Sequence, residues 1–131
     1  MATIKKFEDL EIWQEARRLS KEIIIIISKS TNLKTDYKFK EQIKSSAGSA
    51  MDNIAEGFER DGNLEFRQFL SIAKGSAGET RSQIYRLYDS EYITKFDLEK
   101  LVSEYETLNK RIASFISYLN KKNYKGLKFK S

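Results

Sequence analysis

The stretch "SSAGSAMDNIAEGFER" at residues 45–60 decides how this chain is expected to fold. Its apolar side chains recur every three or four residues, which is the spacing of one face of an α-helix. A second stretch rich in small residues, "AKGSAGE" at residues 73–79, follows after a break at "RDGN". Two such helices joined by a short turn predict an antiparallel hairpin whose backbones pack closely.

The glycines of this hairpin are expected to mark the closest approach. Folding the chain back about Gly62 brings Ser49 opposite Gly75. A glycine inside a helix costs roughly 0.5–1 kcal/mol relative to alanine. We therefore expect close packing between the two helices to compensate this cost at Gly48, Gly75 and Gly78.

The 3.6-residue period extends over the rest of the chain. It predicts helices at about residues 8–30, 36–59, 64–89 and 95–121, with residues 122–131 as a basic tail. Short connections make neighbouring helices antiparallel. The expected fold class is all-α, an antiparallel up-down four-helix bundle in one domain. Expected helix caps are Thr35 or Asp36, then Asn63, then Thr94 with Asp97.

Two adjacent apolar stripes mark the first helix. They contain Leu10, Trp13, Ser20, Ile24 and Ile27 in one, and Ile12, Ala16, Leu19, Ile23 and Ile26 in the other. Such a face is broader than one neighbouring helix requires. Either it supports self-association or partner docking, or the bundle itself covers it.

Composition argues against most catalytic chemistry. The 131 residues include no cysteine and no histidine, so thiolate catalysis, Cys-based zinc sites and the commonest general base are excluded. We expect no enzymatic activity, no cofactor and no metal site. No signal peptide is expected, and the isoleucine run at residues 23–27 is far shorter than the ~20 residues that span a bilayer. The expected location is cytoplasmic, without membrane association.

The net charge of +5 is concentrated at the C-terminus. Residues 1–120 hold equal numbers of acidic and basic side chains, so residues 121–131 carry the whole excess. Candidate nucleic-acid contacts are the lysines of the tail and a second cluster around the first connection: Lys121, Lys122, Lys125, Lys128, Lys130, Lys34, Lys38, Lys40 and Lys44. Tyr124 and Phe129 could stack on unpaired bases. The alternative is a solvated tail that binds nothing.

Three segments, in this order and spacing, resemble a known family. They are "FEDLEIWQEARRL" (7–19), "NIAEGFER" (53–60) and "EFRQFLSIAKGSAGE" (65–79). The chain is similar to the 23S rRNA-intervening-sequence proteins over about residues 7–120. The resemblance implies a four-helix bundle that assembles as a homopentamer and has no established enzymatic activity. It also implies kinship with the accessory variability protein of diversity-generating retroelements, which binds a reverse transcriptase and nucleic acid.

Seven residues match the signature of the family: Asn53, Glu56, Gly57, Arg60, Gly75, Ser76 and Glu79. Asn53, Glu56 and Arg60 share one helix face. They could form helix–helix hydrogen bonds with a surface Glu–Arg pair, line a ligand site, or contact another subunit. Ser45 departs from the family pattern, which has a basic residue there. The hairpin alignment places Ser45 near Glu79.

Two functions remain open after these observations. The first is an oligomeric adaptor associated with RNA or DNA, since phosphate contacts by lysines dominate non-specific affinity. The second is a protein–protein scaffold without nucleic-acid binding, which docks a partner such as a reverse-transcriptase-like enzyme.

Overall fold

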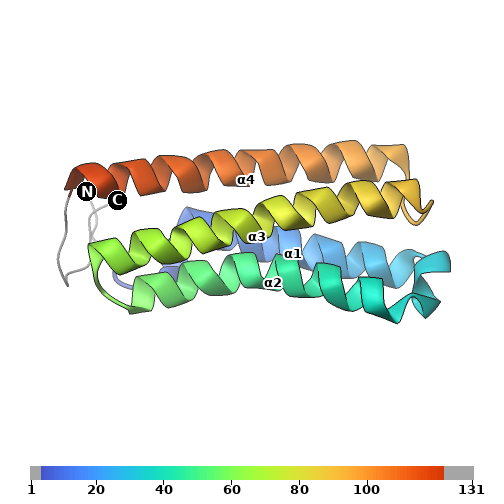
Figure 1. Cartoon of the computed structure of the whole chain (residues 1–131), viewed down its shortest axis with the longest axis horizontal. Coiled ribbons are helices and arrows are strands. Elements are labelled where there is room, and N and C mark those ends of the chain that lie inside the picture. The colour runs from blue at the N-terminus through green and yellow to red at the C-terminus, as the bar shows by residue number, and fades with distance from the viewer. Residues whose placement is uncertain (1–3, 123–131) are drawn as a thin grey trace.

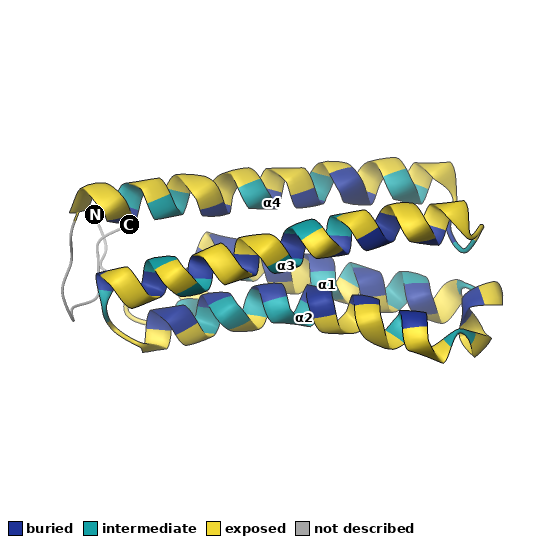
Figure 2. Cartoon of the chain, in the orientation of Figure 1, coloured by how far each residue is buried: buried dark blue, intermediate teal, exposed yellow. Residues whose placement is uncertain are grey.

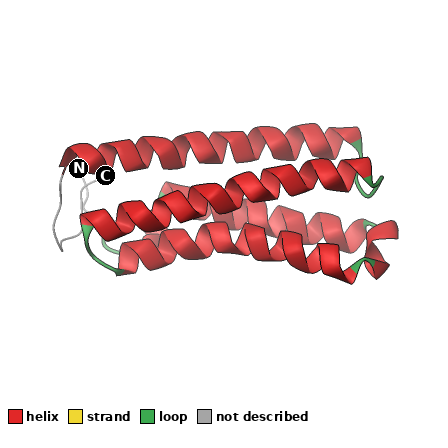
Figure 3. Ribbon diagram, viewed as in Figure 1, coloured by secondary structure: helices red, strands yellow, loops and turns green. Residues whose placement is uncertain are grey.

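A computed structural model of the chain describes residues 4–122, where helices are joined by short loops and no strand occurs (Figure 3). The four long helices are α1 (Glu11–Lys29), α2 (Tyr37–Glu59), α3 (Asn63–Asp89) and α4 (Lys95–Lys122). Two short 3₁₀ helices, η1 (Phe7–Asp9) and η2 (Asn32–Thr35), precede α1 and α2. The predicted all-α fold class is confirmed.

Successive helices run antiparallel and form an elongated bundle (Figure 1). The α1–α2 and α3–α4 connections lie together at one end. The α2–α3 turn, the start of α1 and the end of α4 lie at the other end. Because the two ends are separated by the length of a helix, residues near η2 are far from the last turn of α4.

Buried side chains form one continuous core along the bundle axis (Figure 2). The inward residues expected for α2 are all buried: Phe39, Ile43, Ala47, Ala50, Ile54 and Phe58. In α1 the stripe from Ile12 to Ile23 is buried, whereas Ile24 is 51% exposed. The broad face predicted for α1 is therefore only partly covered by the bundle, because the neighbouring helices leave Ile24 on the outside.

Two of the three predicted caps are present. Asp36 Oδ1 accepts a hydrogen bond from the Phe39 amide at 3.3 Å, and Thr94 Oγ1 accepts one from the Asp97 amide at 3.1 Å. The cap predicted at Asn63 is wrong. Asn63 is the first residue of α3, and its buried amide donates to the Leu119 carbonyl of α4 at 2.8 Å. A hydrogen-bond acceptor 56 residues away in the sequence therefore binds the side chain that local sequence rules assign to helix capping.

The close approach of α2 and α3 occurs at Gly57. A Cβ atom added to Gly57 would lie 2.6 Å from the Phe69 Cβ. The contact predicted at Gly48, Gly75 and Gly78 is wrong, because a Cβ on either of the first two would meet no atom within 4 Å. The nearest atom to a Cβ on Gly78 belongs to Asn109 of α4, at 3.9 Å. Small size is therefore required at only one of these four positions.

Candidate nucleic-acid interface

Two lysines of the predicted basic cluster, Lys34 and Lys40, meet Tyr37 at the start of α2. The Lys40 ammonium lies 4.9 Å from the centre of the Tyr37 ring and donates to the Lys34 carbonyl at 3.1 Å. The Tyr37 ring is 69% exposed. We call the set Lys34, Tyr37, Lys38, Lys40 and Lys44 the basic end. An exposed aromatic ring beside a lysine ammonium is a surface on which an unpaired base can stack.

The lysines of the basic end occupy two rows along α2. Lys40 and Lys44 are one turn apart on one side, and Lys38 points to a different side of the helix because two residues correspond to about 200° of rotation. Lys44 also lies 3.8 Å from Glu41, in an exposed contact that salt screens. The lysines of the basic end therefore cover two sides of α2.

Two further candidate lysines lie far from the basic end. Lys121 and Lys122 are the last residues of α4, and Lys122 packs 5.6 Å from the centre of the Tyr118 ring. They lie at the end of the bundle opposite the basic end (Figure 1). The predicted contacts at Lys125, Lys128 and Lys130, together with Tyr124 and Phe129, fall outside the described residues.

A hydrogen bond ties the basic end to the α3–α4 connection. The Tyr92 hydroxyl donates to Asp36 Oδ2 at 2.9 Å, and this bond raises the pKa of Tyr92. The same carboxylate caps α2 through its other oxygen. Asp36 thus fixes the first turn of α2, from which Tyr37 and Lys38 project.

The signature residues of the α2 face form local contacts. Arg60 pairs with Glu56 at 2.9 Å and lies 5.1 Å from the centre of the Phe69 ring of α3. The hydrogen bond with Glu56 raises the pKa of Arg60. Asn53 donates to the carbonyl and the hydroxyl of Ser49, at 2.8 and 2.9 Å. The predicted Glu–Arg pair is therefore present, whereas both hydrogen bonds of Asn53 stay within α2 and do not cross to α3.

Hydroxyl groups join α2 to α3 in the middle of the bundle. The hydroxyls of Ser49 and Ser76 are 2.9 Å apart. One turn further, Thr80 donates to Ser46 at 2.8 Å, and Ser46 donates to Gln83 Oε1 at 2.6 Å. The small residues of this seam therefore provide hydrogen bonds, and Ser46 and Gln83 become buried polar groups with satisfied partners.

A polar pocket of about 320 Å³ opens above these buried groups. Its wall on α3 consists of Glu79, Gln83 and Arg86, and its wall on α2 includes Gln42 and Ser45. Gly75, a further signature residue, is exposed on α3 outside this pocket. The expected proximity of Ser45 and Glu79 is present, since both line this pocket.

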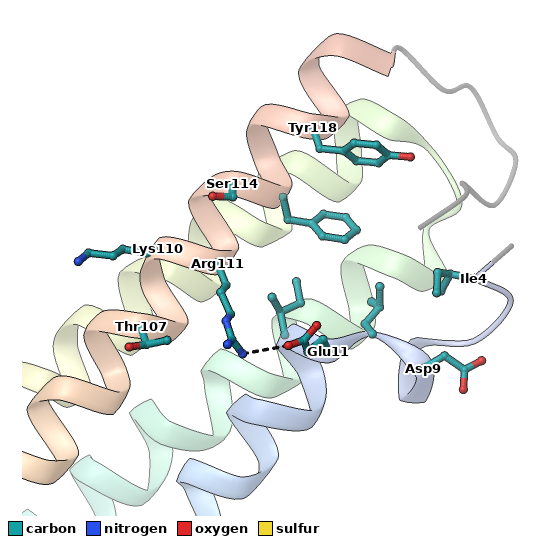
Figure 4. Close-up of a pocket in the computed structure, with 11 residues that line it drawn as sticks. Ile4, Asp9, Glu11, Thr107, Lys110, Arg111, Ser114 and Tyr118 are labelled. Atoms are coloured by element: carbon teal, nitrogen blue, oxygen red, sulfur yellow. Dashed lines mark ion pairs between the residues drawn. The ribbon is translucent and has the colours of Figure 1, made fainter. Parts of the chain in front are cut away.

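A cavity of about 690 Å³ lies between the start of α1 and the second half of α4 (Figure 4). Its lining is mostly apolar and includes Ile4 and Tyr118. Arg111 projects into it but is already bound to Glu11 at 3.1 Å and Glu15 at 2.8 Å. These ion pairs already occupy the guanidinium, so Arg111 is not free to bind a phosphate.

Two further observations concern metal binding and membrane insertion within the described residues. Within residues 4–122, no three Asp or Glu side chains lie close enough to hold a metal ion. No helix in that range has the length and apolar character needed to cross a bilayer.

Sequence reasoning missed four residues of these sites: Tyr37, Gln42, Gln83 and Arg86. Tyr37, Gln42 and Arg86 are exposed and leave no trace in the apolar periodicity, whereas Gln83 is a buried polar residue that an apolar repeat does not mark. The available signal is the spacing of Glu79, Gln83 and Arg86, which places them on one side of a helix.

Comparison with known proteins agrees with this architecture. The family model of the 23S rRNA-intervening sequence protein matches residues 8–114. A crystal structure from Bacteroides thetaiotaomicron VPI-5482, a protein of unknown function from the S23 ribosomal protein family, is 25% identical. The match covers 80% of this chain and 97% of that one, with a TM-score of 0.74. No protein among the curated sequences matches significantly. The chain belongs to the 23S rRNA-intervening sequence protein family.

Proposed function

We propose that this protein is a non-enzymatic, self-assembling adaptor that binds single-stranded nucleic acid through the basic end. The observation that carries the proposal is the position of the Lys40 ammonium, which lies 4.9 Å from the centre of the Tyr37 ring and beside the Lys34 carbonyl, while Tyr37 is 69% exposed. Lysines neutralise phosphates and release counterions, while an aromatic ring stacks on a base. RNA is the preferred class, in line with the name of the family.

Self-assembly is the second part of the proposal. Leu64 and Ile72 lie on the outer side of α3 and are 59% and 52% exposed. Gly75 lies on the same side and leaves open space for an approaching backbone. A second copy of the chain is the proposed partner, and the sequence resemblance favours five copies. A ring of copies would multiply the phosphate contacts of each basic end.

Binding to labelled single-stranded RNA, measured by fluorescence anisotropy with the full chain, tests the proposal. The variant combines Lys34→Glu, Lys38→Glu and Lys40→Glu. The matched control combines Lys21→Glu, Lys74→Glu and Lys110→Glu, which make the same charge change at exposed positions elsewhere. We expect the first variant to bind more than roughly tenfold more weakly than the control, since local phosphate contacts are lost.

Two results would count against this function. Equal weakening by both variants would mean that net charge alone determines binding. Absence of binding by the wild-type protein at low salt would remove nucleic acid as a partner. It would favour the protein–protein scaffold, for which Phe96, 74% exposed at the start of α4, offers an apolar contact point.

A further inference from the structure

The polar pocket between α2 and α3 has a floor that is held in place. Its floor is formed by Ser46 and Gln83, which are 4% and 5% exposed. The Thr80–Ser46–Gln83 hydrogen bonds fix the Gln83 carbonyl, so its amide nitrogen is directed to Glu79 at 3.5 Å. A buried amide with one orientation presents a defined donor to any molecule that enters.

The rim of the pocket carries unused hydrogen-bonding groups. Within residues 4–122, neither Glu79 nor Arg86 forms an ion pair, and the bond between Gln83 and Glu79 is long. The Arg86 guanidinium is held 4.5 Å from the centre of the Phe39 ring. Its stacking on the ring leaves its N–H groups free to bind an anion in bidentate fashion.

The order of these groups along α3 matches one nucleotide. Glu79 and Arg86 are seven residues apart, so they are separated by about 10 Å along the helix axis. That separation is on the scale of a nucleotide from its base edge to its phosphate. Lys38 lies one turn before Gln42 on the same side of α2, so the pocket adjoins the basic end.

We propose that this pocket binds a guanine nucleotide of single-stranded RNA. The N1–H and N2–H groups of the base donate to Glu79, the Gln83 amide donates to O6, and Arg86 binds the phosphate. The assignment rests on the proposed function and adds base selectivity to it. Unpaired bases in RNA are read on this edge by such side chains.

The chemistry of Glu79 selects guanine among the four bases. An ionised carboxylate only accepts hydrogen bonds. Guanine presents two adjacent donors to it, whereas adenine and cytosine present a ring nitrogen that also accepts. Uracil presents one donor between two carbonyl groups. The pocket is lined mainly by polar groups, and none of its lining residues is aromatic. It therefore lacks the buried aromatic side chain that most often anchors a protein–protein contact.

Short labelled oligouridines that carry one central guanosine, adenosine, cytidine or inosine test the assignment with the full chain. We expect the guanosine oligonucleotide to bind roughly tenfold more tightly than the adenosine one, the range of a bidentate base contact. Inosine lacks the N2 amino group and should fall between them. Glu79→Gln should abolish the preference without weakening binding of plain oligouridine. Arg86→Met should weaken binding of every oligonucleotide and keep their ranking.

Matched controls are Glu59→Gln, an exposed carboxylate on α2, and Arg17→Met, whose guanidinium lies over Trp13 at 5.6 Å. Both should behave as wild type. Equal affinity for all oligonucleotides, or a guanosine preference that survives Glu79→Gln, would overturn the assignment. In that case the adaptor function would stand, and the pocket would instead bind a side chain of a partner protein. If no oligonucleotide binds at low salt, both the assignment and the proposed function fail.

Discussion

Gly57 of α2 lies against Phe69 of α3 so closely that an added Cβ atom would come within 2.6 Å of the Phe69 Cβ. The Phe66 ring is also within 3.0 Å of that position, so neither neighbour can move away alone. The bundle therefore requires glycine here for packing, although glycine lowers intrinsic helix stability.

Gly57→Ala is expected to lower the free energy of unfolding by about 1–3 kcal/mol, since it overpacks the seam between α2 and α3. Gly48→Ala is the matched substitution in the same helix. An added Cβ there meets nothing within 4 Å, so it should raise stability by roughly 0.5–1 kcal/mol. Urea unfolding followed by circular dichroism measures both. A change of the same sign for the two variants would contradict the location of the close contact.

Asn63 joins the first turn of α3 to the last part of α4 through the Leu119 carbonyl. Asn63→Ala leaves that carbonyl without its partner and should cost about 1–3 kcal/mol. Asn120→Ala, which removes only the exposed contact with Arg67, should cost less than 1 kcal/mol. Hydrogen exchange of the last turns of α4 should accelerate in the first variant and not in the second. Equal exchange in both would show that the bond contributes nothing to holding α4.

Tyr105 provides a pH-dependent test of the core. Its side chain is 1% exposed, and burial raises the pKa of its hydroxyl well above the usual value. As the pH rises, the unfolded chain therefore loses the Tyr105 proton before the folded chain does. The contribution of Tyr105 to the free energy of unfolding is complete below about pH 10 and declines above it. Tyr105→Phe should lose less stability than the wild type between neutral pH and alkaline pH.

At neutral pH, Tyr105→Phe should be as stable as the wild-type protein or more so. The buried hydroxyl finds no hydrogen-bond partner in the described part of the chain, so its removal relieves a desolvation cost. Thermal unfolding at several pH values compares the two proteins. Identical loss of stability in alkali by both would mean that other groups determine the alkaline limit.

Sequence periodicity was sufficient for the helices and for most of the core. The α2 stripe from Phe39 to Phe58 follows the 3.6-residue repeat, because one face of that helix meets the bundle along its whole length. The repeat also contained a signal for Gly57, which lies on the same stripe as Ala50 and Ile54. The prediction instead placed the close contact at Gly48 and Gly75, where no neighbouring atom approaches.

Long-range partners explain the remaining differences. The Asn63 side chain is determined by a carbonyl in α4, and local capping rules contain no information on that helix. For the candidate pocket, the hairpin alignment placed Ser45 beside Glu79, but the roles of Gln83 and Arg86 depend on the buried Ser46 bond and the Phe39 ring. Those contacts exist only after α2 and α3 have packed.

Self-assembly predicts a mass well above the 15.3 kDa of one chain, with five copies favoured. Ile72→Lys should lower that mass, since it places a charge on the proposed contact face. Ile24→Lys is a matched control, because Ile24 is equally exposed on α1. Light scattering during size-exclusion chromatography measures all three proteins. A single-chain mass for the wild type, or equal effects of both variants, would contradict assembly through α3.

The salt dependence of RNA binding tests the central claim most directly, because it counts phosphate contacts. For single strands, log K falls with log salt at a slope of about −0.7 for each phosphate neutralised. We predict a slope of roughly −2 or steeper per basic end for the wild-type protein, and a slope shallower by about 2 after Lys34→Glu, Lys38→Glu and Lys40→Glu, which remove three phosphate contacts. A wild-type slope near zero, or a slope unchanged by these substitutions, would contradict the account.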